Sequence, residues 1–170
     1  VTLIAGPVNL ATPKNVHRID VTTAHEMWQA SLERAVKNRI FIGCAAVADY
    51  RVAEVADQKI KKTNDNDELS LKLVKNPDII ASVASLEKDR PFVVGFAAET
   101  QNVAEYAKSK LQRKNLDMIC ANDVSGGQVF GQDQNALQIF WKTGEKSLPL
   151  ADKNKLAEVL VTEIVEHYHE

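Results

Sequence analysis

Polar side chains follow three apolar runs of the sequence, at the points where the runs end. They are Asp49 after the run at 40–47, Glu99 and Thr100 after 92–98, and Asn122 with Asp123 after 116–121. In open α/β sheets, ligands bind outside the carboxyl ends of the strands. We therefore expect these side chains to converge on one edge of a sheet, although Asp49 taken alone also fits an ordinary turn or a helix cap.

Two groups of basic residues could bind an anion near those acids. The first group is Lys59, Lys61 and Lys62, and the second is Lys108, Lys110, Arg113 and Lys114. A lysine carries its charge on a flexible stem, so the first group could form a flap over an anion, with a solvated loop as the alternative. Members of the second group that lie one helical turn apart share a face, with a solvated helix end as the alternative. Lysines and acids together suggest a polyphosphate with its metal ion, yet neither a Walker A nor a G-x-G-x-x-G sequence is present.

The elements that must position these residues alternate between strand and helix. The three apolar runs do not alternate in polarity, which is typical of parallel strands covered on both faces. Further strands are expected at 1–4, at 17–21 and, half exposed, at 69–73. Helices are expected to begin at the capping box Thr23–Glu26, at Asn76 as N-cap, at Thr100 and at Asp152. The last helix should turn inward the side chains of Leu156, Val159, Leu160 and Ile164, and a hairpin should join 136–141 to 146–150.

This order of elements predicts a single domain over residues 1–170. Its expected fold is α/β, a Rossmann-like, doubly wound, mostly parallel sheet with a late β-hairpin.

With 21 basic and 23 acidic residues the net charge is −2, which argues against a nucleic-acid partner. No run approaches the ~18 apolar residues that a membrane helix needs. Cys44 and Cys120 lie in apolar runs and are interpreted as reduced thiols of a cytoplasmic protein.

Six short motifs go further than periodicity does. They are AAVADYR (45–51), KIKK (59–62), LVKNPDII (73–80), VGFAAET (94–100), KLQRKNLDMICAND (110–123) and NALQIFW (135–141). Each motif is weak alone, but six in this order are highly specific. Together they resemble the bacterial, CTP-using phosphopantothenate–cysteine ligase family, also called phosphopantothenoylcysteine synthetase, from about Val1 to the C-terminus.

The resemblance implies a ligase of coenzyme A biosynthesis with a two-step reaction. The carboxylate of 4′-phosphopantothenate attacks the α-phosphate of CTP and gives an acyl-cytidylate and pyrophosphate. The amine of L-cysteine then attacks this mixed anhydride and gives the amide and CMP. Mg²⁺ assists the first step, and cations must offset the charge of two anions brought together.

The resemblance also assigns roles to residues that match the family's motifs. A nucleotide-binding backbone stretch is implied for Gly43, Cys44 and Ala45, where small side chains allow close approach. Asp49 is implied as a contact to a ribose hydroxyl or to the metal, whose ligands stay unknown. Lys59 is the implied flap lysine that assists acyl-cytidylate formation. The remaining implied nucleotide contacts are the helix start Pro77, Asp78, Ile79 and Ile80, where free N–H groups favour an anion, then Phe96, Lys110 and Lys114.

One departure from the family pattern concerns the N-terminus. The family begins with a strand, a Gly-Gly-Thr turn and a segment of the kind S-N-x-S-S-G-x-M-G, which this sequence lacks. We therefore expect an N-terminally truncated ligase domain, with weak or no activity as an isolated chain. The resemblance further implies a homodimer, formed in part by the late hairpin, and a flavin-dependent decarboxylase domain in the parent protein.

Two other classes of function stay open at this point. The chain could be a nucleotide-binding or dimerisation fragment without catalysis of its own. A dinucleotide-dependent reductase is suggested by the sheet type alone, and the missing glycine fingerprint counts against it.

Overall fold

A computed structural model describes residues 1–61, 69–99, 101–123 and 133–169 of the chain. The strands are β1 (Thr2–Ala5), β2 (His17–Asp20), β3 (Ile40–Gly43), β4 (Tyr50–Val52), β5 (Leu73–Lys75), β6 (Phe92–Glu99), β7 (Met118–Asp123), β8 (Gln134–Trp141) and β9 (Gly144–Asp152). The helices are α1 (Ala24–Ala35), α2 (Ile79–Ala84), α3 (Val103–Arg113) and α4 (Lys153–His169). Among the described residues, no helix is long and apolar enough to cross a membrane.

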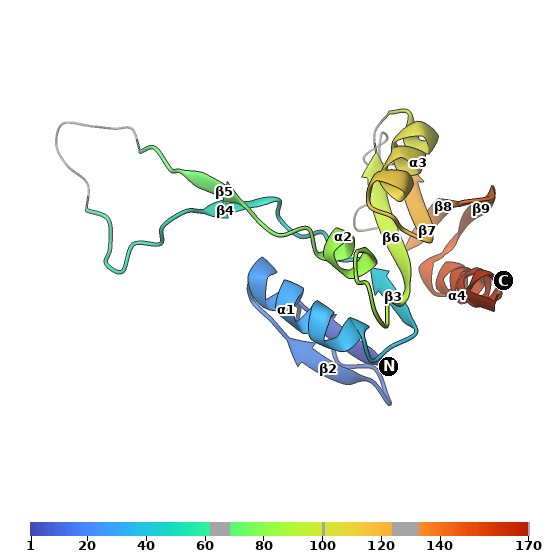
Figure 1. Cartoon of the computed structure of the whole chain (residues 1–170), viewed down its shortest axis with the longest axis horizontal. Coiled ribbons are helices and arrows are strands. Elements are labelled where there is room, and N and C mark those ends of the chain that lie inside the picture. The colour runs from blue at the N-terminus through green and yellow to red at the C-terminus, as the bar shows by residue number, and fades with distance from the viewer. Residues whose placement is uncertain (62–68, 100, 124–132, 170) are drawn as a thin grey trace.

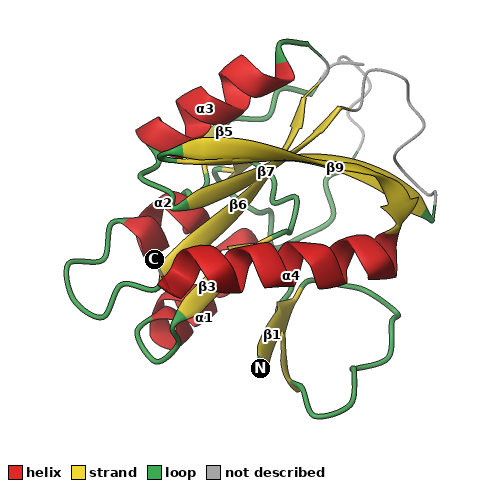
Figure 2. Cartoon of the chain, turned by 90° about the vertical axis from the view of Figure 1, so that its right-hand side faces the viewer, coloured by secondary structure: helices red, strands yellow, loops and turns green. Residues whose placement is uncertain are grey.

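The central sheet has the order β3-β6-β7-β8-β9. Strands β3, β6 and β7 run parallel, whereas β8 and β9 are added antiparallel as a ribbon at one side. The expected mixed α/β fold with a mostly parallel core and a late hairpin is therefore confirmed (Figure 2). Strands β1 and β2 pair with each other in parallel and form a separate small sheet.

Helices cover both faces of this sheet, as a doubly wound fold requires. On one face, buried side chains of α1, α2 and α3 pack against β6 and β7, with Val83, Ala107 and Leu111 among them. On the other face, α4 contributes Leu156, Leu160 and Ile164 to a second core. The expectation that Val159 also points inward is wrong, because this side chain remains 38% exposed.

Two expected strands are shorter than the apolar runs that predicted them. Strand β3 ends at Gly43 instead of continuing to residue 47, and Ile42 is 42% exposed. This strand pairs with β6 on one edge only within its sheet, so it is not covered like the central β6. The half-exposed strand expected at 69–73 is also wrong, since Leu69 and Leu71 are both exposed and β5 begins only at Leu73.

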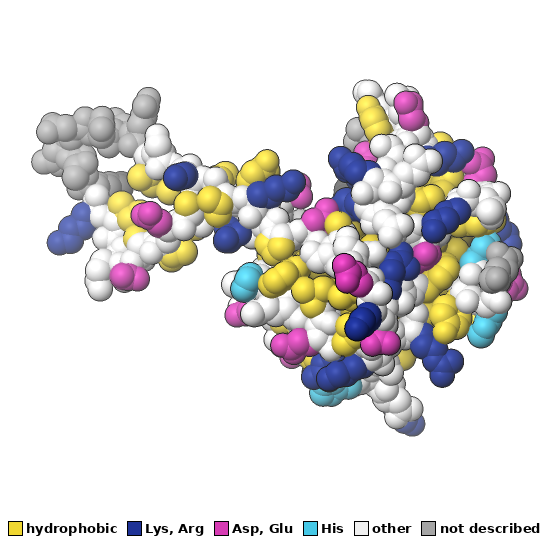
Figure 3. Space-filling view, in the orientation of Figure 1, with side chains coloured by type: hydrophobic (Ala, Val, Ile, Leu, Met, Phe, Trp, Pro, Cys, Tyr) yellow, Lys and Arg dark blue, Asp and Glu magenta, His cyan; other side chains and the backbone are white. Residues whose placement is uncertain are grey.

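Strands β4 and β5 form an antiparallel ribbon that projects from the body of the molecule (Figure 1). We call its described residues, 50–61 and 69–75, the arm. Large apolar side chains are exposed along it, which Figure 3 shows as yellow patches between the charged ones. They are Tyr50, Val55, Ile60, Leu69, Leu71 and Leu73.

The helix starts confirm two expectations and correct one. Thr23 and Glu26 form the capping box of α1, and Asp152 Oδ1 accepts the N–H of Asn154 at the start of α4. Helix α2 is capped by Asp78, whose Oδ1 accepts the N–H of Ala81, so the expected N-cap Asn76 is wrong. The expected start of α3 at Thr100 lies outside the described residues, and the helix itself begins after Asn102.

Candidate functional site

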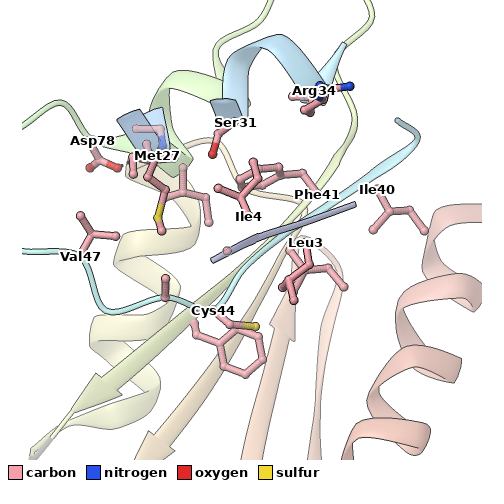
Figure 4. A pocket seen from close by; sticks show the side chains of 18 of the residues that line it. Leu3, Ile4, Met27, Ser31, Arg34, Ile40, Phe41, Cys44, Val47 and Asp78 are labelled. Carbon is pink, nitrogen blue, oxygen red and sulfur yellow. Dashed lines mark hydrogen bonds between the residues drawn. The ribbon is translucent and has the colours of Figure 1, made fainter. Parts of the chain in front are cut away.

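A single cavity of about 1610 Å³ collects most of the residues that the sequence singled out. It lies between β1 with α1 and the edge formed by β3, α2 and the end of α3. Figure 4 shows Asp78 and Arg34 at opposite ends of this view, with Ile4, Met27 and Phe41 between them. Eleven of the twelve predicted nucleotide contacts line it, namely Gly43, Cys44, Ala45, Asp49, Pro77, Asp78, Ile79, Ile80, Phe96, Lys110 and Lys114. The twelfth, Lys59, is exposed on the arm.

Asp78 connects the start of α2 to the end of α3 at the cavity. Its Oδ1 caps α2 through the N–H of Ala81 at 3.1 Å, and its Oδ2 lies 2.9 Å from Lys114 Nζ. Burial alone would raise the pKa of Asp78, but the hydrogen bond and charge of Lys114 and the Ala81 N–H outweigh it and lower that pKa. The expected free N–H groups at this helix start are therefore partly used, because the Asp78 carboxylate already occupies one of them.

Lys110 is held in a similar way by the end of β6. Its Nζ lies 2.5 Å from Glu99 Oε1, and both side chains are partly buried. Phe96, three residues before Glu99, also lines the cavity and packs against the core on the α4 face. Lys110 and Lys114 are thus each paired with a carboxylate, which fixes where their ammonium groups lie.

The loop that carries Asp49 is fastened to the segment between β5 and α2 by a buried asparagine. Asn76 donates its Nδ2 hydrogen to the carbonyl of Ala48 at 2.8 Å, and its backbone N–H bonds to the carbonyl of Asp49 at 2.8 Å. Arg51 Nη1 donates to Asn76 Oδ1 at 3.2 Å and to the carbonyl of Lys75 at 2.9 Å. Sequence reasoning gave Asn76 a helix-capping role and missed this one, although a buried polar side chain must find such partners.

Gly43 has a packing role that the sequence did not reveal. It is paired in register with Gly95 across β3 and β6. A Cβ at Gly43 would lie 3.1 Å from Ile80 Cδ1, and a Cβ at Gly95 would lie 3.0 Å from the same atom. The two glycines therefore make room for Ile80, which seats the first turn of α2 on the sheet.

The two cysteines are both protonated thiols at neutral pH. Cys44 is reached from the cavity, yet the side chains around it desolvate its sulfur and raise the pKa. Cys120 is buried in β7, and burial together with the nearby Cys44 raises its pKa to about 12. Neither thiol is therefore activated as a nucleophile.

At the ends of β6 and β7, the residues expected to converge are neighbours in the backbone register of the sheet. Glu99 and Asp123 are neighbours in the register of β6 and β7, and Asn122 Oδ1 accepts a hydrogen bond from Asn135. Asp49 instead lies beyond the end of β3, just before β4. Thr100 and Lys62 lie outside the described residues.

Basic residues of α1 and the turn after it also line the cavity, and sequence reasoning did not select them. They are Arg34, Lys37 and Arg39. Their clustering within six positions of the sequence was the available signal. In the part of the chain that the structure describes, no three His, Cys, Asp or Glu residues come together as a metal site.

The comparison with known protein families decides the family. The DNA/pantothenate metabolism flavoprotein C-terminal domain matches residues 1–168. The chain belongs to this family. Its relatives include the coenzyme A biosynthesis bifunctional protein CoaBC of Haemophilus influenzae, 73% identical over 168 residues, and that of Escherichia coli K12, 58% identical over 172 residues. The H. influenzae alignment spans 99% of this chain and the E. coli alignment 100%, but each spans only 42% of the relative.

Two solved structures share the fold. The C-terminal domain of a CoaBC protein aligns with a TM-score of 0.77 and 31% identity, over 96% of this chain and 71% of that one. A Cab2 mutant in complex with phosphopantothenate-cysteine aligns with a TM-score of 0.69 and 16% identity, over 92% of this chain and 54% of that one. At such an identity the second likeness shows the fold alone.

Proposed function

We propose that this chain is the ligase part of a coenzyme A biosynthesis protein and joins 4′-phosphopantothenate to L-cysteine. The convergence of eleven predicted nucleotide contacts on one cavity carries this proposal. The bifunctional CoaBC relatives support the pathway, and the Cab2 neighbour supports the product, because phosphopantothenate-cysteine contains the amide that such a ligase would form.

The proposed substrate for activation is CTP, bound along the β3–α2 edge of the cavity. Lys110 and Lys114 would bind its phosphates, and Lys59, which lies on the projecting arm and outside the cavity, would reach them only after the arm moves toward the cavity. The carboxylate of 4′-phosphopantothenate would displace pyrophosphate from the α-phosphate, and the cysteine amine would then displace CMP. These lysines would offset the charge that builds up when two anions meet and would thereby lower the barrier to the first step.

Mg²⁺ fits this site only in company with the nucleotide. Mg²⁺ is commonly held by one or two carboxylates together with substrate phosphates, and the cavity offers Asp49, while Asp78 is already bound to Lys114 and to the Ala81 N–H. The ion would neutralise phosphate charge. Asp49 would hold either the ion or a ribose hydroxyl, and its place on a loop fastened by Asn76 fits both roles.

Calorimetric titration of CTP with Mg²⁺ into this chain, with ATP as the comparison, tests the nucleotide proposal. We expect selective CTP binding that is weakened about tenfold or more in Lys114→Gln, since a charge-assisted phosphate contact is lost. The exposed Lys155→Gln is a matched control, because it removes the same charge from α4. Equal binding of CTP and ATP, or binding of neither, would overturn the assignment of CTP.

The ligase reaction itself requires an activity assay. Full-length protein supplied with CTP, 4′-phosphopantothenate and cysteine should release pyrophosphate and CMP in equal amounts. Accumulation of pyrophosphate when cysteine is omitted would support the acyl-cytidylate. The second candidate function is a nucleotide-binding or dimerisation fragment, and CTP binding by the isolated chain without turnover would favour it.

The proposed homodimer would form in part through the β8–β9 hairpin in a cytoplasmic protein that also carries a flavin-dependent decarboxylase domain. Leu150 on β9 is 67% exposed, and the second copy of the chain would cover it in the proposed dimer. Sedimentation of the wild-type chain should give a dimer, and Leu150→Glu should shift it to a monomer. A wild-type monomer at all concentrations would contradict the dimer for this chain.

A further inference from the structure

Glu99 is a carboxylate at the site that neither the motifs nor the comparisons assign to binding. We propose that Glu99 is a positioning residue, which fixes the ammonium group of Lys110 at the cavity wall so that it meets the phosphates of a bound nucleotide. This inference rests on the proposed nucleotide-binding function and adds a residue to it.

The alternation of β6 explains why Glu99 can reach Lys110. Successive side chains of a strand point to opposite faces of its sheet. Phe96 packs against the core on the α4 face, while Ala97 belongs to the opposite core with Ala107 and Leu111 of α3. Glu99 is two residues after Ala97, so it shares the α3 face, and there it meets Lys110 at 2.5 Å.

The burial of the pair places the carboxylate behind the lysine. The side chain of Glu99 is only 17% exposed, whereas that of Lys110 is 35% exposed. Of the two, Lys110 is the one that lines the cavity in the described structure. The carboxylate therefore approaches the ammonium group from the protein side, and the cavity side of the lysine stays open to a ligand.

In this arrangement Glu99 can hold Lys110 in place without competing with the phosphates for it. An ammonium group has three N–H donors, and one suffices for Glu99. The remaining donors can bind phosphate oxygens. Because Lys110 is already ordered in the free protein, nucleotide binding does not have to include the entropy cost of ordering its side chain. Asp78 differs in this respect, because its carboxylate itself lines the cavity beside Lys114.

The direction in which one substitution changes the affinity for CTP shows whether Glu99 positions Lys110 or competes with the phosphates for it. Glu99→Gln keeps the shape of the side chain and removes its charge. If Glu99 positions Lys110, the affinity for CTP with Mg²⁺ should fall about tenfold, because the lysine becomes mobile. If Glu99 only competes with the phosphates, the affinity should rise. Glu99→Asp keeps the charge and should lose less affinity than Glu99→Gln.

A second measurement does not depend on the nucleotide. Acetic anhydride acetylates free amines, and peptide mass spectrometry gives the rate for Lys110 separately. An amine bound to a carboxylate reacts slowly, so Glu99→Gln should raise this rate severalfold while the rate at exposed Lys108 stays constant. A change confined to overall stability would not single out Lys110.

The matched control is Glu105→Gln, which removes the same charge from the exposed first turn of α3. It should leave both readouts unchanged. Faster acetylation of Lys110 together with weaker CTP binding in Glu99→Gln supports the proposal. Unchanged acetylation, or unchanged or tighter CTP binding, overturns it. A wild-type chain that binds no CTP would overturn the nucleotide function, while the acetylation rate would still decide whether Glu99 holds Lys110.

Discussion

At the scale of single residues, carboxylates hold several of the basic side chains of this protein in place. Glu99 pairs with Lys110, Asp78 with Lys114 and Asp117 with Arg90. Carboxylates also cap helices, as Glu26 and Asp78 do. One charge can therefore serve both a helix start and a binding site, which makes its substitution informative.

Asp78→Asn separates these two roles. Asparagine caps a helix about as well as aspartate, so α2 should keep its cap. Lys114 would lose its charged partner, and a cavity carboxylate that opposes phosphates would be gone. We expect the affinity for CTP with Mg²⁺ to rise by about two- to fivefold, in line with ~0.5–1 kcal/mol for a partly exposed pair. Calorimetry measures this, and weaker binding would show that Asp78 positions Lys114 instead.

Glu26 predicts a pH dependence of stability. Its carboxylate accepts the N–H of Thr22, the hydroxyl of Thr22 and the N–H of Thr23, at 2.7, 2.8 and 3.0 Å. These bonds lower the pKa of Glu26 from 4.5 to about 2. Because the folded pKa lies below the unfolded one, the contribution is complete above about pH 4.5 and disappears as the pH falls toward 2.

Urea unfolding at several pH values tests this contribution. Glu26→Ala should unfold at lower urea than wild type at pH 7, and the difference should shrink below pH 4.5. The exposed Glu33→Ala on the same helix is the control and should show no such dependence. A constant difference between Glu26→Ala and wild type from pH 7 to pH 2.5 would contradict the expectation.

At the scale of elements, the position of α2 on the sheet depends on two adjacent glycines. Gly43 and Gly95 leave the space that Ile80 fills, and Ile80 belongs to the turn that carries Asp78. The cavity edge is therefore built by close packing of a short helix on two strands. A small change in this contact should move the Asp78–Lys114 pair.

Gly95→Ala tests this packing. The new Cβ would lie 2.8 Å from Leu116 Cδ1 and 3.0 Å from Ile80 Cδ1, so buried neighbours must shift. We expect a loss of about 1–3 kcal/mol in the free energy of unfolding, as for other overpacked cores. Gly6→Ala is the control, because the nearest atom to its Cβ among those described is Met27 Cε at 3.9 Å. Equal stability of both variants would refute the role of Gly95.

At the scale of the whole molecule, we expect stability and nucleotide binding to depend on different parts of the sheet. The predicted nucleotide contacts Gly43, Cys44 and Asp49 lie at and beyond the carboxyl end of β3, although the cavity itself extends along that strand to Arg39. Near the amino end of β6, Arg90 donates to the carbonyls of Ala84, Pro91 and Asn115 and to Asp117 Oδ2. This arginine joins the end of α2, the start of β6 and the connection from α3 to β7.

Arg90→Ala should therefore reduce stability without changing nucleotide binding. Asp117 and three carbonyls would lose a charged donor in a partly buried place, and we expect a cost of about 2–3 kcal/mol. Urea unfolding measures the loss of stability. Calorimetric titration of CTP without urea, at a low temperature at which the variant remains folded, measures whether its affinity has changed. Arg113→Ala, an exposed arginine at the end of α3, is a control for stability. If Arg90→Ala lost as much CTP affinity as Lys114→Gln, the expectation that Arg90 affects stability but not nucleotide binding would be contradicted.

The sequence by itself predicted the types and order of most elements, but not strand β4 or the bounds of β5. Apolar runs without alternation gave the parallel strands, because a strand covered on both faces needs apolar residues throughout. The capping box placed the start of α1, and the late hairpin followed from Thr143-Gly144 between two strand-like segments. These features depend on neighbours in the chain, so local patterns are sufficient to predict them. The six motifs pointed to a phosphopantothenate–cysteine ligase, and comparison shows that the chain belongs to the DNA/pantothenate metabolism flavoprotein C-terminal domain family.

Only the tertiary structure decided which side chains meet. Glu99 with Lys110 and Asp78 with Lys114 are separated by 11 and 36 positions, and no local pattern encodes such pairs. The early end of β3, the exposure of Leu69 and Leu71, and the role of Asn76 also depend on what lies across space from them. An apolar run predicts that burial is favourable, but whether a partner is present to cover it is a property of the folded molecule.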